Sequence, residues 1–196
     1  RTVEDSDRES RSAISSFRLP AELQNRLYPH QRIGVRWLQE QHQKGHGALL
    51  GDEMGLGKTI QMISLIIAGE GTTDGPTLIV VPTSLMTQWK SEITKFTGGT
   101  MRVEIAHNSD PNGLLIELMR TQVYITSYGT VARNMRVFGD ASITWGRIIL
   151  DEAHMIRNSR NKTTVALMSL KAHNRWCISG TPIQNGAKDM VTLLEF

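Results

Sequence analysis

Short runs of consecutive apolar residues alternate along the chain with longer segments in which apolar residues recur at helical spacing. Several of the short runs, such as residues 78–81 and 148–150, are apolar on both faces of an extended chain. This pattern is typical of strands in a parallel sheet that helices cover on both sides. Strands are predicted at residues 48–50, 77–81, 101–106, 123–126, 147–150 and 175–179.

The segments between these runs have the periodicity of helices. Residues 31–43 carry an apolar helical stripe, and Gly45 and Gly47 end it. Further helices are predicted at residues 58–68, 84–96, 113–120, 130–137, 163–170 and 188–195. These segments supply the crossovers that parallel strands require. The sequence therefore predicts an α/β fold with a mainly parallel sheet and helices on both faces, and ligands are expected beyond the carboxyl ends of the strands.

One domain is predicted over residues 17–196, since 196 residues suit a single large domain. Residues 1–16 are Ser-rich and charged, and they are predicted to form a flexible lead-in. The chain starts with Arg1 and shows no signal peptide, which is typical of a piece of a longer protein.

The composition excludes several classes of protein. Hydrophobic residues make up 39% and charged residues 21%, which excludes collagen and wholesale disorder. No apolar run approaches the roughly 20 residues of a membrane span, so no membrane partner is expected. The single Cys177 cannot form an internal disulfide, and six His with one Cys show no zinc spacing, so a reducing compartment is expected. The net charge of +3 is compatible with nucleic-acid binding but does not show it.

A glycine-rich turn follows the first predicted strand and precedes an apolar helix. It nearly matches the phosphate-binding loop GxxxxGK[ST], although Asp52 stands at the first glycine position. Gly55 and Gly57 let backbone N–H groups face an anion at the positive end of the following helix. Lys58 would reach the β- and γ-phosphates, and Thr59 would be a ligand of Mg²⁺. The predicted nucleotide-binding residues are Asp52, Glu53, Met54, Gly55, Leu56, Gly57, Lys58 and Thr59.

Two carboxylates follow the buried strand at residues 147–150. Asp151 and Glu152 at the tip of such a strand repel each other, and a divalent cation removes that repulsion. Asp151 is therefore predicted to hold Mg²⁺, and Glu152 to orient and deprotonate an attacking water. Lys58, Asp151 and Glu152 are the predicted catalytic residues. A third strand ends in a tight turn in which Ser179 and Thr181 place hydroxyls near the apex.

These segments, in this order, resemble the first RecA-like lobe of a superfamily II helicase-type motor. Residues 52–61, 151–154 and 179–185 are similar to motifs of the SWI/SNF family of double-stranded DNA translocases, as are residues 27–31 followed by Gly34, Trp37 and Leu38. The resemblance covers residues 27–196. It implies a P-loop ATPase lobe that uses ATP and Mg²⁺, in a nuclear protein that moves along duplex DNA and remodels chromatin or other protein–DNA complexes.

The resemblance also implies roles for single residues. Gln31 matches the glutamine that reads the adenine edge, and His154, Ser179 and Thr181 match residues that couple the lobes, with His154 bonded toward the Thr181 turn. The segments 81–89 and 126–128 match DNA-facing motifs, so Thr83, Ser84, Thr126 and Ser127 are the DNA-binding candidates, with helix capping as the alternative use of their hydroxyls. Trp89, at helical spacing from Leu85 and Ile93, is predicted to lie in the core.

Several alternatives stay open at this point. A DEAH-type RNA helicase and an ATP-gated binding scaffold are the competing functions. The subgroup is the lodestar and post-replication-repair group or the Cockayne-syndrome-B type. Family motors carry a second RecA-like lobe with arginine fingers, which this sequence lacks, so the resemblance implies slow hydrolysis by these residues alone.

Overall fold

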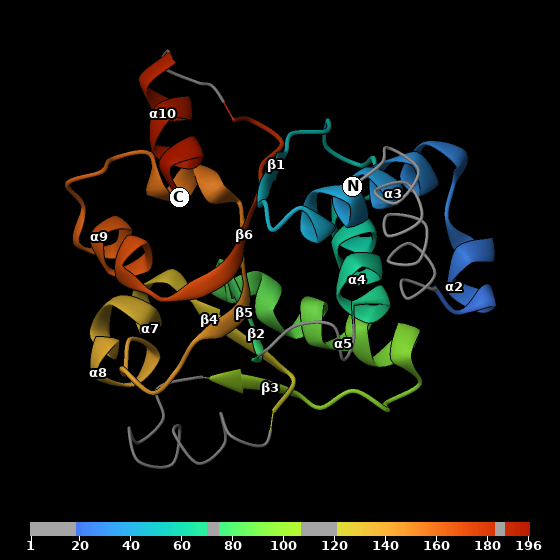
Figure 1. Cartoon of the computed structure of the whole chain (residues 1–196), viewed down its shortest axis with the longest axis horizontal. Helices are drawn as coiled ribbons and strands as arrows, with labels where there is room; N and C mark the ends of the chain where they lie inside the picture. Colours follow the sequence, from blue (N-terminus) through green and yellow to red (C-terminus); the bar gives the residue numbers. More distant parts are fainter. Residues whose placement is uncertain (1–18, 70–74, 107–120, 183–186) are drawn as a thin grey trace, which may run out of the picture.

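The computed structural model describes residues 19–69, 75–106, 121–182 and 187–196. These residues form a six-stranded, all-parallel sheet in the order β1-β6-β5-β2-β4-β3 (Figure 1). The strands are β1 (Ala48–Leu50), β2 (Thr77–Val81), β3 (Val103–Ala106), β4 (Val123–Ser127), β5 (Trp145–Asp151) and β6 (Ala172–Ile178). All six predicted strands are confirmed, and their ends shift by a few residues.

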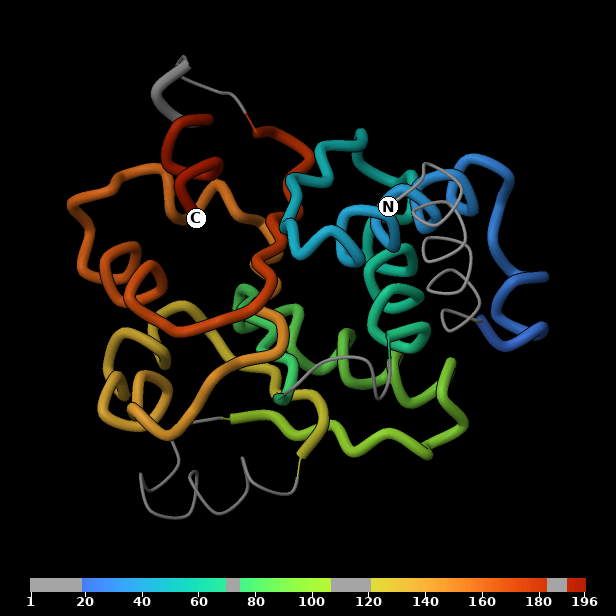
Figure 2. Tube along the Cα trace, in the orientation of Figure 1, coloured from blue at the N-terminus to red at the C-terminus, as the bar shows by residue number. Residues whose placement is uncertain are grey.

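Helices cover both faces of the sheet. On one side lie α3 (Pro29–Gln43), α4 (Lys58–Ala68) and α5 (Met86–Thr97), and on the other lie α7 (Tyr128–Arg133), α8 (Met135–Phe138) and α9 (Lys162–Ser169) (Figure 1). The remaining elements are α2 (Ala21–Arg26), α10 (Ala187–Glu195), and the short 3₁₀ helices η1 (Thr83–Leu85) and η2 (Ala153–Ile156). The end of α10 packs near η2 and β1, far from α2 (Figure 2).

The predicted helices differ from the observed ones in three places. The helix predicted at 130–137 is divided into α7 and α8 by Asn134. The one predicted at 84–96 starts with the 3₁₀ turn η1, and α2 was not predicted. The helix predicted at 113–120 lies outside the described residues. In the part of the chain that the structure describes, no helix is long and apolar enough to cross a membrane.

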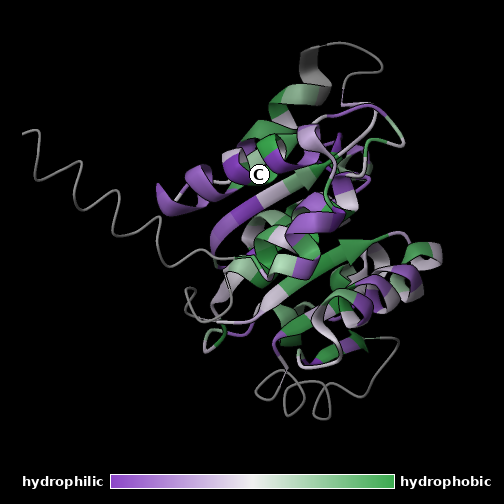
Figure 3. Cartoon of the chain, turned by 90° about the vertical axis from the view of Figure 1, so that its right-hand side faces the viewer, coloured by the Kyte–Doolittle hydropathy of each residue, from purple (hydrophilic) through white to green (hydrophobic). Residues whose placement is uncertain are grey.

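Two hydrophobic cores lie on opposite faces of the sheet. One contains Trp89 and Ile63 with the side chains of α4 and α5, and the other contains Tyr128, Phe138 and Trp145 with those of α7 and α9. Hydrophobic colour gathers in the central strands, and hydrophilic colour on the outer parts of the helices (Figure 3). Because β2 and β5 are buried on both faces, the sheet fixes where their carboxyl ends lie.

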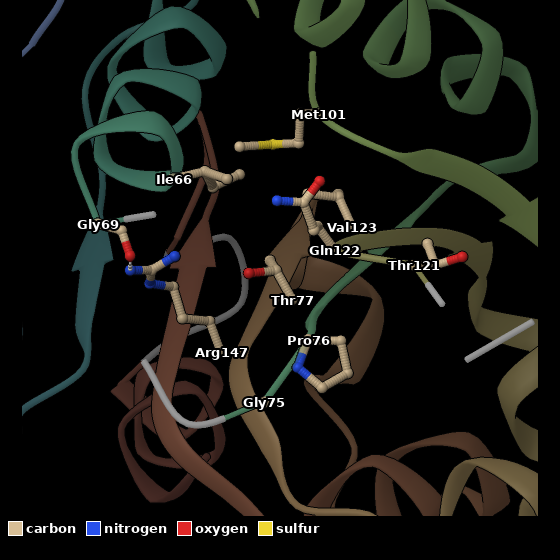
Figure 4. A pocket seen from close by; sticks show the side chains of 10 residues that line it. All are labelled: Ile66, Gly69, Gly75, Pro76, Thr77, Met101, Thr121, Gln122, Val123 and Arg147. Carbon is tan, nitrogen blue, oxygen red and sulfur yellow. Dashed lines mark hydrogen bonds between the residues drawn. The ribbon is translucent and has the colours of Figure 1, made fainter. Parts of the chain in front are cut away.

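A buried arginine lies at the edge of the sheet where the strands begin. Arg147, 2% exposed, donates from Nη2 to the carbonyl oxygen of Gly69, which ends α4, at 2.9 Å (Figure 4). Burial lowers the pKa of this guanidinium to about 10, so it stays charged at neutral pH. A cation at the negative end of a helix dipole is stabilised. A cavity of about 200 Å³ lies here, and Thr77 and Gln122 also line it. We assign to Arg147 only the role of capping α4.

Gly47, just before β1, lies against the main chain of β6. An added Cβ at Gly47 would lie 1.7 Å from the carbonyl oxygen of Arg175. Since that atom belongs to a paired strand, it cannot move without disturbing the pairing of β1 with β6. We expect Gly47→Ala to lower the free energy of unfolding by about 2–3 kcal/mol, as measured by urea denaturation followed through tryptophan fluorescence.

Gly45 provides the control for this prediction. It has a φ of +72°, but nothing lies within 4 Å of an added Cβ. Gly45→Ala should therefore lower stability by only about 1 kcal/mol, the cost of the left-handed backbone alone. Equal losses in the two variants would contradict the close approach at Gly47.

Candidate functional site

The glycine-rich loop between β1 and α4 has the backbone of an anion-binding turn. Gly55 and Gly57 adopt left-handed conformations, with φ of 86° and 80°. Gly57 precedes the first turn of α4, and no side chain caps the N–H groups there. The φ of Gly57 would strain any residue with a Cβ, and that Cβ would lie 2.2 Å from Nε2 of Gln31, so the Gln31 side chain would have to move as well. The start of α4 thus presents uncapped N–H groups and the positive end of the helix dipole.

Lys58 folds onto its own loop. Its Nζ donates to the carbonyl oxygens of Asp52 at 2.6 Å and Glu53 at 2.8 Å. The Asp52 carboxylate accepts a bond from Nε2 of Gln61 at 3.0 Å, which ties the loop to α4. Helix α4 therefore holds the loop, and the Lys58 ammonium lies against the carbonyl oxygens of the turn.

The side chain of Gln31, the residue predicted to read adenine, contacts the backbone of the loop. Its Nε2 donates to the carbonyl oxygen of Leu56 at 3.1 Å, and its Oε1 accepts from the Tyr28 N–H at 3.0 Å. The His30 ring lies 3.2 Å from the same Leu56 oxygen. The side chain of Gln31 is 5% exposed. Side chains at the beginning of α3 therefore hold the loop in place. The role of Gln31 in adenine recognition stays a prediction.

Asp151 is the last residue of β5, and its carboxylate is buried and hydrogen-bonded. Trp89 Nε1 donates to Oδ2 at 2.8 Å, and the Glu152 N–H donates to Oδ1 at 2.9 Å. Burial raises the pKa of the Asp151 carboxyl above its ordinary value, while these bonds and Lys58 act in the opposite direction. A buried carboxylate of this kind favours a nearby cation.

Glu152 has a strained backbone, and the ring of His154 lies beside its carboxylate. Its φ of 50° is the only positive φ of a non-glycine residue in the described ranges. Nδ1 of His154 lies 3.1 Å from Oε2 of Glu152. Backbone strain of this kind persists where the surrounding structure enforces it, and functional sites are where it concentrates.

The loop and the acidic pair meet in one place. A cavity of about 380 Å³ is lined by side chains and backbone of both segments, together with parts of α5. Its lining includes Gly57, Lys58, Thr59, Asp151 and Glu152. The sequence places Lys58 and Asp151 after different strands, and the fold brings them to the same hollow at the carboxyl edge of the sheet.

The third predicted segment lies beside this cavity. The Ser179 N–H donates to the carbonyl oxygen of Leu50 at 3.2 Å, just before the loop. A Cβ on Gly180 would lie 3.6 Å from Nζ of Lys58. The Thr181 N–H donates to Oγ of Ser179 at 3.2 Å. Residues 183–185 of this motif lie outside the described residues.

The predicted bond from His154 toward the Thr181 turn stays a prediction. The carbonyl oxygen of Thr181 accepts from Nη2 of Arg157 at 3.2 Å, and Nδ1 of His154 lies 3.1 Å from Oε2 of Glu152. His154 lies in the 3₁₀ turn η2, which begins directly after Glu152. Arg157, which the sequence did not single out, spans the gap with its longer side chain.

The DNA-binding candidates divide into exposed and buried residues. Thr83 and Ser84 are exposed in η1, beyond the end of β2. Thr126 is fully buried and its hydroxyl donates to the Ala106 carbonyl oxygen at 3.3 Å, so we propose no DNA contact for it. Ser127 caps α7 by accepting from the Thr130 N–H at 3.2 Å. The capping alternative thus describes Ser127, and its DNA contact stays a prediction.

Two aromatic residues of the site were missed as polar partners. Trp89 is 1% exposed, which confirms its predicted place in the core, but its indole N–H also binds Asp151. The Tyr128 hydroxyl donates to the carbonyl oxygen of Asp151 at 2.6 Å. The sequence offered only a general indication of these bonds, because a buried tryptophan or tyrosine usually needs a hydrogen-bond partner for its polar atom.

Comparison with known proteins agrees with this geometry. A family model described as the SNF2-related domain matches residues 30–196. The chain belongs to this family. The predicted SWI/SNF helicase-like N-terminal lobe is thereby confirmed, while the subgroup stays a prediction.

Proteins of several organisms are similar to this chain in sequence. It is 36% identical over 197 residues to "SNF2 domain-containing protein ENL1" of Oryza sativa subsp. japonica, covering 92% of this chain and 20% of that protein. It is 38% identical to "DNA excision repair protein ERCC-6-like" of Danio rerio (93% and 13%) and 38% identical to "Helicase SWR1" of Debaryomyces hansenii (94% and 12%). This SNF2-family chain thus spans a fifth or less of the length of these three relatives.

A solved structure shows the same fold. The Sulfolobus solfataricus SWI2/SNF2 ATPase core in complex with dsDNA superposes with a TM-score of 0.77 at 30% identity. The match covers 86% of this chain and 35% of that one. The all-parallel sheet with helices on both faces is therefore the RecA-like fold of SNF2 ATPase cores, as the sequence predicted.

Proposed function

We propose that this chain is the ATP-binding lobe of a DNA-dependent ATPase that moves along double-stranded DNA and remodels chromatin or other protein–DNA complexes. The observation that carries the proposal is the shared cavity of Lys58 and Asp151 beside the Gly180 turn. Membership of the SNF2-related family supports ATP as the nucleotide. The names of the relatives, which mention excision repair and SWR1 helicase, support a nuclear role on chromatin.

The residues at the cavity fit a magnesium–nucleotide complex. The uncapped N–H groups at the start of α4 and the Lys58 ammonium would hold the phosphates. Among the described residues no group of three or more His, Cys, Asp or Glu could hold a metal ion alone. Magnesium commonly takes one or two protein oxygens and completes its shell with phosphates and water. Thr59 and Asp151 would supply those oxygens, and the bound ion would neutralise charge on the phosphates.

In this proposal Glu152 would activate the attacking water. It lines the cavity beside Asp151, and Nδ1 of His154 lies 3.1 Å from its Oε2. A carboxylate that is not a metal ligand keeps a lone pair free to accept the proton of the attacking water. In this proposal His154 therefore orients Glu152.

Duplex DNA and a second RecA-like lobe are the proposed partners. The solved neighbour was determined with dsDNA, and this chain covers 35% of it, which leaves room there for a second lobe. Thr83 and Ser84 expose hydroxyls beyond β2, where phosphate oxygens accept hydrogen bonds. The second lobe of the same polypeptide would supply the arginine fingers, which contribute about 10³–10⁵-fold to the rate.

The test compares nucleic acids as activators of ATP hydrolysis. In the whole protein that contains this chain, duplex DNA should raise the turnover number at least about tenfold, whereas single-stranded RNA should not. Stimulation should fall steeply with salt, because phosphate contacts release counterions. ATP-dependent displacement of a third strand from a DNA triplex would report movement. Stimulation by single-stranded RNA alone would favour an RNA helicase, and nucleic-acid-independent turnover would contradict the proposal.

A further inference from the structure

Asp151 is held from both faces of the sheet. On the α5 side, Trp89 donates to its carboxylate at 2.8 Å, and on the α7 side, Tyr128 donates to its carbonyl oxygen at 2.6 Å. The two aromatic residues belong to the two separate hydrophobic cores. Trp89 is 1% exposed and Tyr128 4% exposed, so water does not compete for either bond. The carboxylate therefore cannot rotate without breaking a buried hydrogen bond.

Each aromatic residue is connected to one predicted DNA-facing segment. Trp89 lies in α5, which continues directly from η1 with Thr83 and Ser84. Tyr128 is the first residue of α7 and follows Ser127. Because Val81 of β2 pairs with Ser127 of β4, both segments lie at the same edge of the sheet. A short stretch of helix or turn joins each segment to an atom of Asp151.

Packing alone does not explain these contacts. Phenylalanine would fill nearly the same apolar space as Tyr128, and it would keep a smaller aromatic ring in place of Trp89, since both rings lie in the cores. What phenylalanine lacks is the N–H or O–H that reaches Asp151. Polar partners that hold a metal ligand in place commonly affect metal affinity and activity by about 10–100-fold.

We propose that Trp89 and Tyr128 are positioning residues that couple DNA occupancy at the two segments to the orientation of the Asp151 carboxylate. The inference rests on the proposed function, because it names how DNA regulates the same ATP site. A displacement of η1 moves α5 and the indole, and a displacement of Ser127 moves the phenol. Both displacements reach Asp151 through hydrogen bonds rather than through the nucleotide.

The test uses Trp89→Phe and Tyr128→Phe in the whole protein. ATP hydrolysis is measured with and without duplex DNA over a range of Mg²⁺ concentrations. For Trp89→Phe we expect the Mg²⁺ concentration at half-maximal rate to rise and the stimulation by DNA to fall, each about tenfold. For Tyr128→Phe we expect a smaller loss of stimulation and little change in the Mg²⁺ dependence, since Tyr128 holds the main chain.

Trp145→Phe is the matched control. Trp145 is fully buried in β5, the strand that ends at Asp151. Like that of Trp89, its indole N–H donates a hydrogen bond, here to the Phe138 carbonyl oxygen at 3.1 Å. That bond lies at the other end of the strand from Asp151. The control should change thermal stability without changing the stimulation ratio or the Mg²⁺ dependence.

The outcomes separate this inference from the proposed function. If both variants fold and duplex DNA stimulates their ATP hydrolysis as strongly as that of the wild type, the inference is overturned and the proposed function stands. A wild-type protein that duplex DNA does not stimulate would overturn the proposed function and the inference with it. If Trp89→Phe does not fold, the stimulation ratio of Tyr128→Phe decides: a retained ratio overturns the coupling, and a reduced ratio supports it.

Discussion

Glutamine in place of Glu152 is expected to slow ATP hydrolysis by about 10²–10⁴-fold, the usual contribution of a general base, and to leave ATP binding nearly unchanged. The amide has the shape of the carboxylate and still offers an oxygen to Nδ1 of His154, which lies 3.1 Å from Oε2. It cannot accept a proton from water. Since neither residue is glycine, the left-handed backbone at this position is strained to a similar degree in both proteins.

The measurement is single-turnover hydrolysis together with binding of a fluorescent ATP analogue in the whole protein. Glu92→Gln is the matched control, because Glu92 lines the same cavity and its carboxylate accepts from Gln88 at 2.9 Å. The control removes the same charge from the same hollow. Equal losses in the two variants would indicate a general field effect, and a normal rate for Glu152→Gln would remove the base role and favour the scaffold alternative.

The strands and the site loop could be predicted because their causes are local. The β2 and β5 runs are apolar on both faces, and this pattern requires a covered parallel sheet. Helix α4 was predicted at its observed ends because Gly57 and Gly69 flank an apolar run. Since all the strands are parallel, the ends of β1, β5 and β6 had to meet at one edge.

Elements that depend on distant contacts were harder to predict. Three of the first four residues of β6 are polar, and this part of the strand is extended because it pairs with β5, where Trp145 faces Ala172. Helix α2 has six residues and buries only Leu23, so it has almost no periodic signal. Both elements owe their structure to neighbours that local periodicity does not reveal.

The same distinction holds in the site. Lys58, Asp151 and Glu152 stand out in the sequence because their motifs carry chemistry. The bond from Trp89 to Asp151 joins residues 62 positions apart, and only the fold brings them together. The bond from Arg157 to the Thr181 carbonyl oxygen likewise joins residues 24 positions apart, and the sequence did not indicate it.

Replacing Lys58 with alanine is expected to lower ATP turnover by at least about 10²-fold while leaving the fold intact. In the structure the ammonium donates to two carbonyl oxygens of its own loop, those of Asp52 and Glu53, and phosphate oxygens of a nucleotide could replace them as acceptors. The glycine conformations of the loop and the bond from Gln61 to Asp52 do not involve the ammonium, so we expect both to remain in the variant. Turnover, nucleotide binding and the melting temperature should be measured together.

Lys90→Ala separates the specific effect of Lys58 from the loss of any positive charge. Lys90 pairs with Glu104 at 3.3 Å on the surface, where both side chains are about half exposed, at 40% and 51%, and such pairs contribute little to stability. Its turnover should match the wild type. Normal turnover in Lys58→Ala would contradict the phosphate-loop assignment even though Lys58 and Asp151 share a cavity, because proximity alone does not make a lysine bind phosphate. A loss confined to Lys58→Ala, with an unchanged melting temperature, places the electrostatic stabilisation at this ammonium.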